Sequence, residues 1–263
     1  MPHEQSIDIE LQFNQKRESA YRHINEYVRD RTAYYRDTTT KGINLKKLLS
    51  KDIIMFAARG VTTSDEFAEE SFKAIESSSE ETVMGNRWQA IIAAVSSDTI
   101  DSGDITTVRD GVLWICELKS QPNTTNSSSF PQELRALKAQ LKERGRYQRA
   151  SKQPLKAAFC ILRSNKSIDE MRTYHAAEGD NANRDLNGFE YRHLEGKAFW
   201  KWLVGTDSPQ GLINDTTRIE KGDIVEARQK ALARVKRELN DALDDHKLPH
   251  TIDGVLELKR VLG

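Results

Sequence analysis

The segment that decides the fold prediction is GDITTVRDGVLWICELKS, residues 103–120. Two runs rich in β-branched and aromatic residues flank an Arg-Asp-Gly tripeptide, which is a typical β-hairpin pattern. Asp110 and Gly111 suit the central positions of a type I′ turn, where both residues need a positive φ. The segment therefore predicts two antiparallel strands joined by a tight turn.

The turn fixes which residues face each other across the hairpin. In this register Asp104 lies opposite Glu117, and facing residues point to the same side of a sheet. Lys119 shares that side because side chains alternate along a strand. The opposite side is apolar and suits packing on a helix; it carries Trp114, Cys116 and Leu118.

The facing acids point to a chemical function. Two carboxylates placed opposite each other repel, so a sheet avoids the pair unless a cation compensates. Mg²⁺ is commonly held by one or two carboxylates, with phosphate oxygens and water as its other ligands. We expect Asp104 and Glu117 to hold such an ion and Lys119 to orient the attacking water, as in metal-assisted phosphodiester hydrolysis.

The tripeptide Glu-Leu-Lys alone carries little information. It occurs again at 257–259, in IDGVLELKRVLG, where the nearest preceding acid is Asp253 and no hairpin fits between them. We interpret this second copy as part of a solvated terminal segment. The prediction of a site at 117–119 depends on the turn and on the acid in register.

Composition excludes several classes of protein. The 263 residues carry 40 basic and 40 acidic side chains, so the overall charge says nothing about a polyanionic partner, and any such argument must rest on local charge. Cys116 and Cys160 lie in apolar runs and are expected to be buried thiols in a reducing compartment. With no apolar run long enough for a membrane span or signal peptide, we expect a cytoplasmic protein. Zinc-ligand spacing and nucleotide-binding glycine motifs are missing as well.

The remaining pattern predicts an α/β core on a helical N-terminal layer. A helix is expected over about 7–36, and further helices follow to about residue 78. Ser78 and Glu81 form a capping-box pattern that predicts a new helix from about residue 79 to Val95. Beyond the hairpin, the expected elements are a helix near 132–148, strands near 154–164 and 188–194, a short aromatic helix near 195–205, and a terminal helix near 222–245.

Three consecutive parts are expected along the chain. Residues 1–76 form a helical N-terminal region, 77–205 the core, and 206–263 a C-terminal helical segment, all within what we expect to be one continuous domain.

Asp104, Glu117 and Lys119 resemble the motif of the PD-(D/E)XK nuclease superfamily residue by residue. Gly103 stands where the motif has proline. Further stretches are similar to type II restriction endonucleases of that superfamily, namely SSSEETVMGNRWQ, ELKSQPNTTNSSSFPQ and GKAFWKWLVG. The resemblance covers about residues 50–205 and implies a restriction-endonuclease-like α/β (α+β) fold with a mixed central sheet flanked by helices.

The resemblance also implies an activity and a site. It implies Mg²⁺-dependent cleavage of double-stranded DNA, with Mn²⁺ as a substitute, by a homodimer of a restriction-modification system. The backbone carbonyl of Leu118 would assist in holding the metal. Gln89 stands where such enzymes often have a glutamate on the preceding helix. Its side-chain carbonyl can ligate a metal or hold a water, and Glu81 is the alternative acid on this helix.

Local charge agrees with a DNA substrate. From Gln132 to Arg172 there are 11 Lys and Arg against four Asp and Glu, while the segment 64–104 is acidic. Phosphate contacts supply most of the affinity for DNA, although a solvated helix face has the same composition. The polar loop after Lys119 suits base contacts or a flexible linker equally. Our candidate DNA-binding residues are Asn123, Asn126, Gln132 and Arg135.

Two alternatives remain open at this point. A repair or structure-specific nuclease of the same fold would share the catalytic residues and lack sequence preference. A non-catalytic DNA-binding protein of the same fold would have no need of facing carboxylates.

Overall fold

The computed structural model describes residues 2–96, 99–100, 105–122, 129–147 and 154–263. The chain divides into two compact units. We call one the sheet unit, formed by Met1–His23 and Gly85–Thr216, and the other the helical unit, formed by Ile24–Met84 and Thr217–Gly263. The helical unit thus combines residues from Ile24 onward with the C-terminal helices, whereas three consecutive parts are expected from the sequence.

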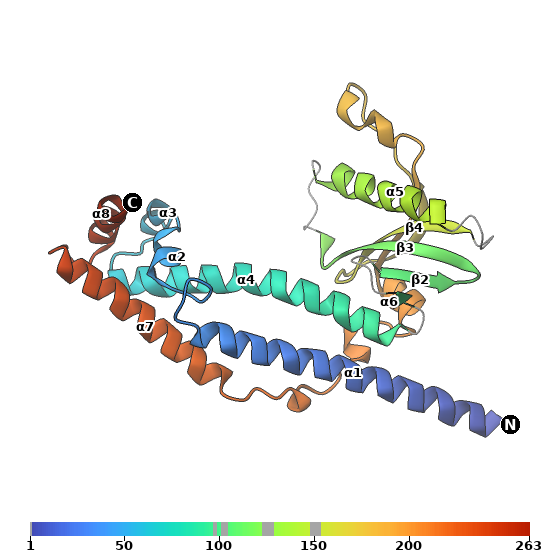
Figure 1. Cartoon of the computed structure of the whole chain (residues 1–263), viewed down its shortest axis with the longest axis horizontal. Coiled ribbons are helices and arrows are strands. Elements are labelled where there is room, and N and C mark those ends of the chain that lie inside the picture. The colour runs from blue at the N-terminus through green and yellow to red at the C-terminus, as the bar shows by residue number, and fades with distance from the viewer. Residues whose placement is uncertain (1, 97–98, 101–104, 123–128, 148–153) are drawn as a thin grey trace. The chain divides into compact units, whose positions relative to one another are not determined.

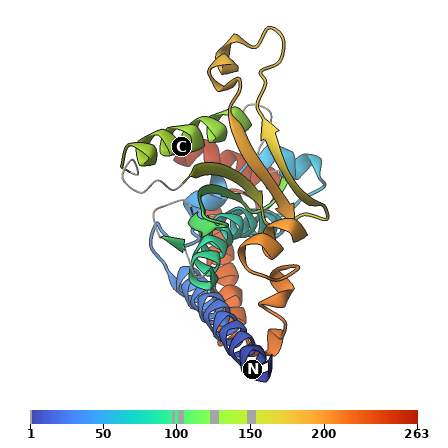
Figure 2. The same cartoon turned by 90° about the vertical axis from the view of Figure 1, so that its right-hand side faces the viewer.

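A mixed six-stranded sheet, in the order β1-β2-β3-β4-β6-β5, forms the centre of the sheet unit. β3 and β4 run parallel, as do β4 and β6, and the remaining neighbours are antiparallel. The strands are β1 (Thr99–Ile100), β2 (Ile105–Arg109), β3 (Val112–Lys119), β4 (Leu155–Ile161), β5 (Ser167–Thr173) and β6 (Glu190–Gly196). In Figure 2 the β5–β6 connection, with the 3₁₀ helix η3 (Asn181–Leu186), extends beyond the strands.

The β2–β3 hairpin has the predicted register. Asp110 and Gly111 have φ values of 53° and 74°, which fit a type I′ turn. Arg109 pairs with Val112, and the described ladder continues to Ile105 and Cys116. The sequence prediction of this hairpin is therefore confirmed as far as Ile105.

Helices cover both faces of the sheet (Figure 1). On one face α5 (Phe130–Tyr147) buries Leu134 and Leu137 in a cluster with Ile115 and Phe159. On the other face α6 (Lys197–Leu203) brings Trp202 against Trp114, with ring centroids 5.8 Å apart. The expectations of a mixed sheet flanked by helices, and of an apolar side at Trp114, are confirmed.

The helical unit is built from long helices around an apolar core. Phe67, Phe72, Val235 and Leu258 are fully buried there. Its helices are the later part of α1 (Pro2–Arg36), α2 (Leu45–Leu49), α3 (Ile53–Ala58), the earlier part of α4 (Ser64–Val95), α7 (Ile224–Asp245) and α8 (Ile252–Leu262). Short 3₁₀ turns lie at Pro209–Gly211 and Thr216–Arg218. In the described part of the chain, no helix has the length and hydropathy that a bilayer crossing requires.

The helical unit also contains a partly buried polar network. Glu76 accepts two hydrogen bonds from Arg228, at 2.6 and 2.7 Å, and one from the Tyr35 hydroxyl at 2.5 Å. The Arg31 guanidinium is 2% exposed and donates to Ser79 Oγ at 2.8 Å. These contacts join α1, α4 and α7 through charge-assisted hydrogen bonds.

The expected break before residue 79 is wrong. α4 is a single helix from Ser64 to Val95, and the Thr82 hydroxyl bonds to the Ser78 carbonyl within it. Ser78 and Glu81 therefore do not start a helix. The Ser-Glu run contains neither glycine nor proline to stop the preceding helix, which continues through it.

The interpretation of the C-terminal segment as solvated is wrong as well. Residues 252–262 form α8, which Thr251 caps by accepting a hydrogen bond from the Gly254 amide. Val255 and Leu258 are completely buried. Apolar residues at this three-residue spacing form the buried stripe of a helix.

Candidate active site

Glu117 and Lys119 occupy the C-terminal end of β3, in the interior of the sheet. β3 pairs with β4 so that Glu117 lies beside Phe159 and Lys119 beside Ile161. Phe159 and Ile161 belong to the cluster under α5, so both polar side chains project from this covered face. Only 9% of Glu117 is exposed, and a buried carboxylate needs compensating partners.

Lys119 bridges two carboxylates. Its Nζ lies 2.8 Å from Glu117 Oε1 and 2.7 Å from Glu133 Oε1. Burial alone would lower the pKa of the Lys119 amine, but hydrogen bonds to Glu117 and Glu133 outweigh it and raise this pKa. The amine therefore carries a full positive charge between the two acids.

Glu133 is the site residue that the sequence analysis missed. It lies in the first turn of α5, and its amide donates to the Ser129 carbonyl at 3.1 Å. The Phe130 ring packs edge-on against Phe159, with centroids 5.1 Å apart, which fixes this end of α5 over β4. A lone acid at the start of a basic helix was a weak signal, because acids favour that position in any helix.

Three predicted site residues, Asp104, Asn123 and Asn126, lie outside the described residues. The β2–β3 ladder ends one position after Asp104, at the pair Ile105 and Cys116. The facing arrangement of Asp104 and Glu117 stays a prediction.

The two accessory candidates belong to different units. Gln89 is a half-buried residue of α4 in the sheet unit, next to Trp88, whose ring meets Trp200 of α6 at 5.9 Å. Glu81 is exposed on α4 within the helical unit. Their proposed roles beside the metal stay predictions.

Of the predicted DNA-binding residues, Gln132 and Arg135 are described. Gln132 is exposed in the first turn of α5, next to Glu133. The Arg135 guanidinium forms a two-pronged ion pair with Asp185 of η3, at 2.8 and 2.9 Å, and bonds to the Ala182 carbonyl at 3.0 Å. Arg135 therefore also fixes η3 to α5.

The donor chemistry of this face fits a hard divalent cation. Within the described residues, no three His, Cys, Asp or Glu side chains gather closely enough to form a complete metal cluster. The carboxylates of Glu117 and Glu133 supply oxygen atoms, the ligand type that Mg²⁺ prefers. Both carboxylates contact the Lys119 ammonium, which shows that the site accommodates positive charge. Asp104 would add a third carboxylate.

Comparison with known proteins identifies the family. A family model for the type II restriction endonuclease EcoO109I matches residues 22–213, which is more than half of the chain and includes Glu117, Lys119 and Glu133. A search of curated proteins found no match. The PD-(D/E)XK resemblance is consistent with this family and with the mixed sheet. The chain belongs to the EcoO109I family of type II restriction endonucleases.

Proposed function

We propose that the protein is a Mg²⁺-dependent endonuclease that hydrolyses phosphodiester bonds at specific sites in double-stranded DNA. The observation that carries this proposal is the position of Lys119, held between Glu117 and Glu133 on a covered sheet face. Family membership supports DNA as the substrate. The cation and the sequence specificity are our inferences.

Glu117, Asp104 and the Leu118 carbonyl would hold the ion. When bound, Mg²⁺ supplies a Lewis acid for a phosphoryl oxygen and a source of activated water. Lys119 projects from the same side of β3 as Glu117, so its ammonium can bond to a phosphate oxygen and orient the attacking water. Both residues lie on an interior strand, which gives them the fixed spacing that such positioning requires.

Glu133 has a separate role as a positioning residue. If Glu117 turns its carboxylate toward a cation, Lys119 loses one of its two acidic partners. Glu133 still accepts a hydrogen bond from the amine and holds it near the scissile phosphate. This division lets one acid serve the ion while the other keeps the lysine in place.

Several further features belong to the proposal. We place Asn123, Asn126, Gln132 and Arg135 at the DNA surface, with Gln132 directly beside Glu133. A homodimer would present two such sites to a two-fold symmetric sequence. We assign this activity to the cytoplasm, as part of a restriction-modification system.

Digestion of a sequenced plasmid with and without Mg²⁺ tests the proposal. We expect discrete fragments with Mg²⁺, none in EDTA, and loss of cleavage in Glu117→Gln and Lys119→Ala. Glu257→Gln is the matched control, because Glu257 belongs to the second Glu-Leu-Lys tripeptide, on α8. Full activity in the Glu117 and Lys119 variants would refute the site, and a smear of fragments would identify a nuclease without sequence preference.

A further inference from the structure

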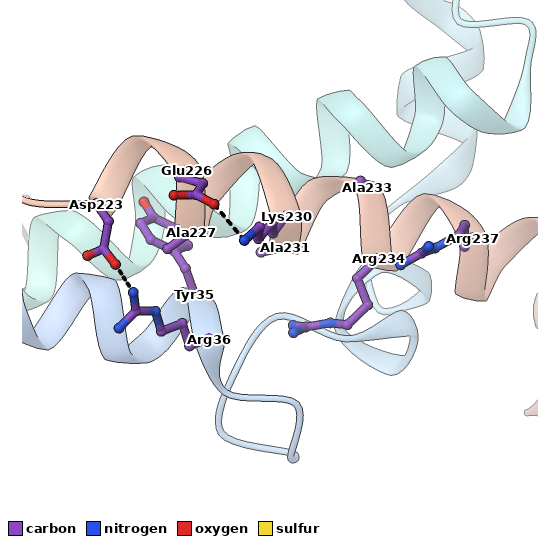
Figure 3. Close-up of a pocket in the computed structure, with 10 residues that line it drawn as sticks. All are labelled: Tyr35, Arg36, Asp223, Glu226, Ala227, Lys230, Ala231, Ala233, Arg234 and Arg237. Carbon is purple, nitrogen blue, oxygen red and sulfur yellow. Dashed lines mark hydrogen bonds and ion pairs between the residues drawn. The ribbon is translucent and has the colours of Figure 1, made fainter.

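A groove in the helical unit lies between the C-terminal end of α1 and the first half of α7 (Figure 3). Its volume is about 700 Å³. Ala227, Ala231 and Ala233 form part of its wall, so short side chains leave the surface of α7 open to a bulky group. No residue that lines the groove belongs to the candidate active site, whose Glu117, Lys119 and Glu133 are residues of the sheet unit.

Basic side chains predominate around the groove. It is lined by four cationic residues and two acidic ones: Arg36, Lys230, Arg234, Arg237, Asp223 and Glu226. Each acid already has a partner, because Arg36 pairs with Asp223 and Lys230 with Glu226, the second pair at 2.6 Å. Neither acid of the groove pairs with Arg234 or Arg237, although Arg234 Nε lies 3.6 Å from Glu238 Oε1 outside the lining, so the positive charge of Arg237 is in excess among the lining residues.

Arg234 is fixed in position. Its Nη2 donates to the carbonyls of Asp37 at 3.1 Å and Ile43 at 3.0 Å, which turns the guanidinium toward the space between α7 and the end of α1 (Figure 3). The Nε atom is buried and makes no hydrogen bond to any described residue, and Glu238 Oε1 lies 3.6 Å from it. A buried donor in this state costs stability until an acceptor reaches it.

The spacing along α7 aligns the cations. Lys230, Arg234 and Arg237 are four and three residues apart, which places them on one side of the helix. At a rise of about 1.5 Å per residue, the row extends over roughly 10 Å. Such a row suits an extended anion.

We infer that this groove binds a phosphodiester segment of the DNA backbone. Phosphate oxygens accept charge-assisted hydrogen bonds from arginine, and they match the fixed Arg234 and the exposed Arg237. The Tyr35 ring is 2% exposed and its hydroxyl bonds to Glu76, so it is not available to stack on a base. The groove therefore contributes affinity that does not depend on sequence. This inference rests on DNA as the substrate, proposed above, and adds a contact that involves none of the candidate catalytic residues.

Binding of a labelled random-sequence duplex by the full chain, in EDTA and at several salt concentrations, tests the inference. For the double variant Lys230→Gln/Arg237→Gln we expect affinity to fall about 10-fold near 50 mM salt. The slope of log affinity against log salt should decrease by about two, since each phosphate contact contributes close to one. Arg260→Gln is the matched control, because Arg260 is an exposed arginine of α8 that does not line the groove.

Cleavage assays separate this inference from the proposed function. If both hold, the double variant needs a higher DNA concentration to reach half of its maximal cleavage rate, whereas Glu117→Gln binds DNA and does not cleave it. If the nuclease proposal fails, the binding and salt experiments still decide the role of the groove. An unchanged affinity and slope in the double variant would overturn the inference. So would binding of inorganic phosphate or of an acidic peptide in the groove without competition from DNA.

Arg234→Lys provides a second variant. Lysine keeps the positive charge but lacks the planar guanidinium, whose Nη2 bonds to the two carbonyls and whose other N–H groups can bond to a ligand. We expect DNA affinity to fall about three-fold or more in protein that thermal unfolding shows to be folded. Wild-type affinity in folded Arg234→Lys would contradict a guanidinium-specific phosphate contact.

Discussion

Lys119 Nζ lies 2.7 Å from Glu133 Oε1, so a strand end and a helix start, joined by a polar loop, meet at one ion pair. With Glu117 on its other side, the lysine is shared by two acids of different elements. Glu117 is fixed by the sheet, and Glu133 by the packing of α5. The position of the lysine therefore depends on the docking of α5 as well as on β3.

Glu133→Gln should lower the cleavage rate while leaving Mg²⁺ affinity almost unchanged. A neutral amide holds the ammonium less strongly, and we expect kcat to fall about 10-fold, equivalent to about 1.4 kcal/mol. Single-turnover cleavage and calorimetric Mg²⁺ titration measure the two effects. Glu143→Gln, on the exposed side of the same helix, is the control. Equal rates in both variants would exclude a positioning role for Glu133, and Glu133→Asp should recover part of the rate.

Stability should depend on pH through Glu76. Burial raises the pKa of this carboxyl, but the hydrogen bonds from Arg228 and Tyr35 outweigh it, so the pKa lies below its usual value of 4.5. A pKa that is depressed on folding contributes stability above the unfolded pKa, and this contribution is lost as pH falls through the folded value. Glu76→Gln should therefore cost about 2 kcal/mol at pH 7 and progressively less below pH 4.5. Urea unfolding at several pH values measures it, and a pH-independent difference would contradict the assignment.

Leu258→Ala should destabilise the protein by about 2–5 kcal/mol, because this side chain of α8 is completely buried in the apolar core of the helical unit. Leu262→Ala, at a position that is 53% exposed on the same helix, should change stability by less than about 0.5 kcal/mol. Chemical denaturation of both variants provides the comparison. Similar small effects would restore the interpretation of residues 252–262 as a solvated segment.

Gly111→Ala should destabilise the hairpin by about 1–2 kcal/mol, because Gly111 has a φ of 74° that L-residues adopt at a cost. Gly85→Ala should change the stability in the opposite direction. Gly85 is helical, with nothing within 4 Å of an added Cβ, so alanine should stabilise α4 by about 0.5–1 kcal/mol. Opposite shifts in Tm are expected, and a stabilising Gly111→Ala would be inconsistent with the type I′ turn.

Local signals explain what could be predicted from the sequence. The turn residues Asp110 and Gly111 set the register of β2 and β3, which places Glu117 and Lys119 on one side without any long-range information. The buried strand β4 and the aromatic helix α6 were also recognisable from their composition. In each of these elements the apolar pattern matches the burial.

Features without a local pattern were missed. β5 is an edge strand with mostly exposed side chains, so the alternation that normally indicates a strand is absent. The capping pattern of Ser78 and Glu81 predicts a division of α4, but the helix is continuous because the residues around this pattern favour a helix. Glu133 reaches Lys119 only because α5 packs back onto the sheet, which is a tertiary effect that spacing in the sequence does not encode.

The ion pairs of Lys119 with Glu117 and Glu133 also have a consequence for sequence variation among relatives of this protein. Lys119 precedes the connection from β3 to α5 and Glu133 follows it, and the ion pair between these two side chains fixes both ends of the connection. If the proposed function holds, insertions and substitutions between Lys119 and Glu133 would change the DNA contacts of the loop and leave the Lys119–Glu133 ion pair in place. We expect relatives with different target sequences to vary in this interval and to keep an acid at its far end.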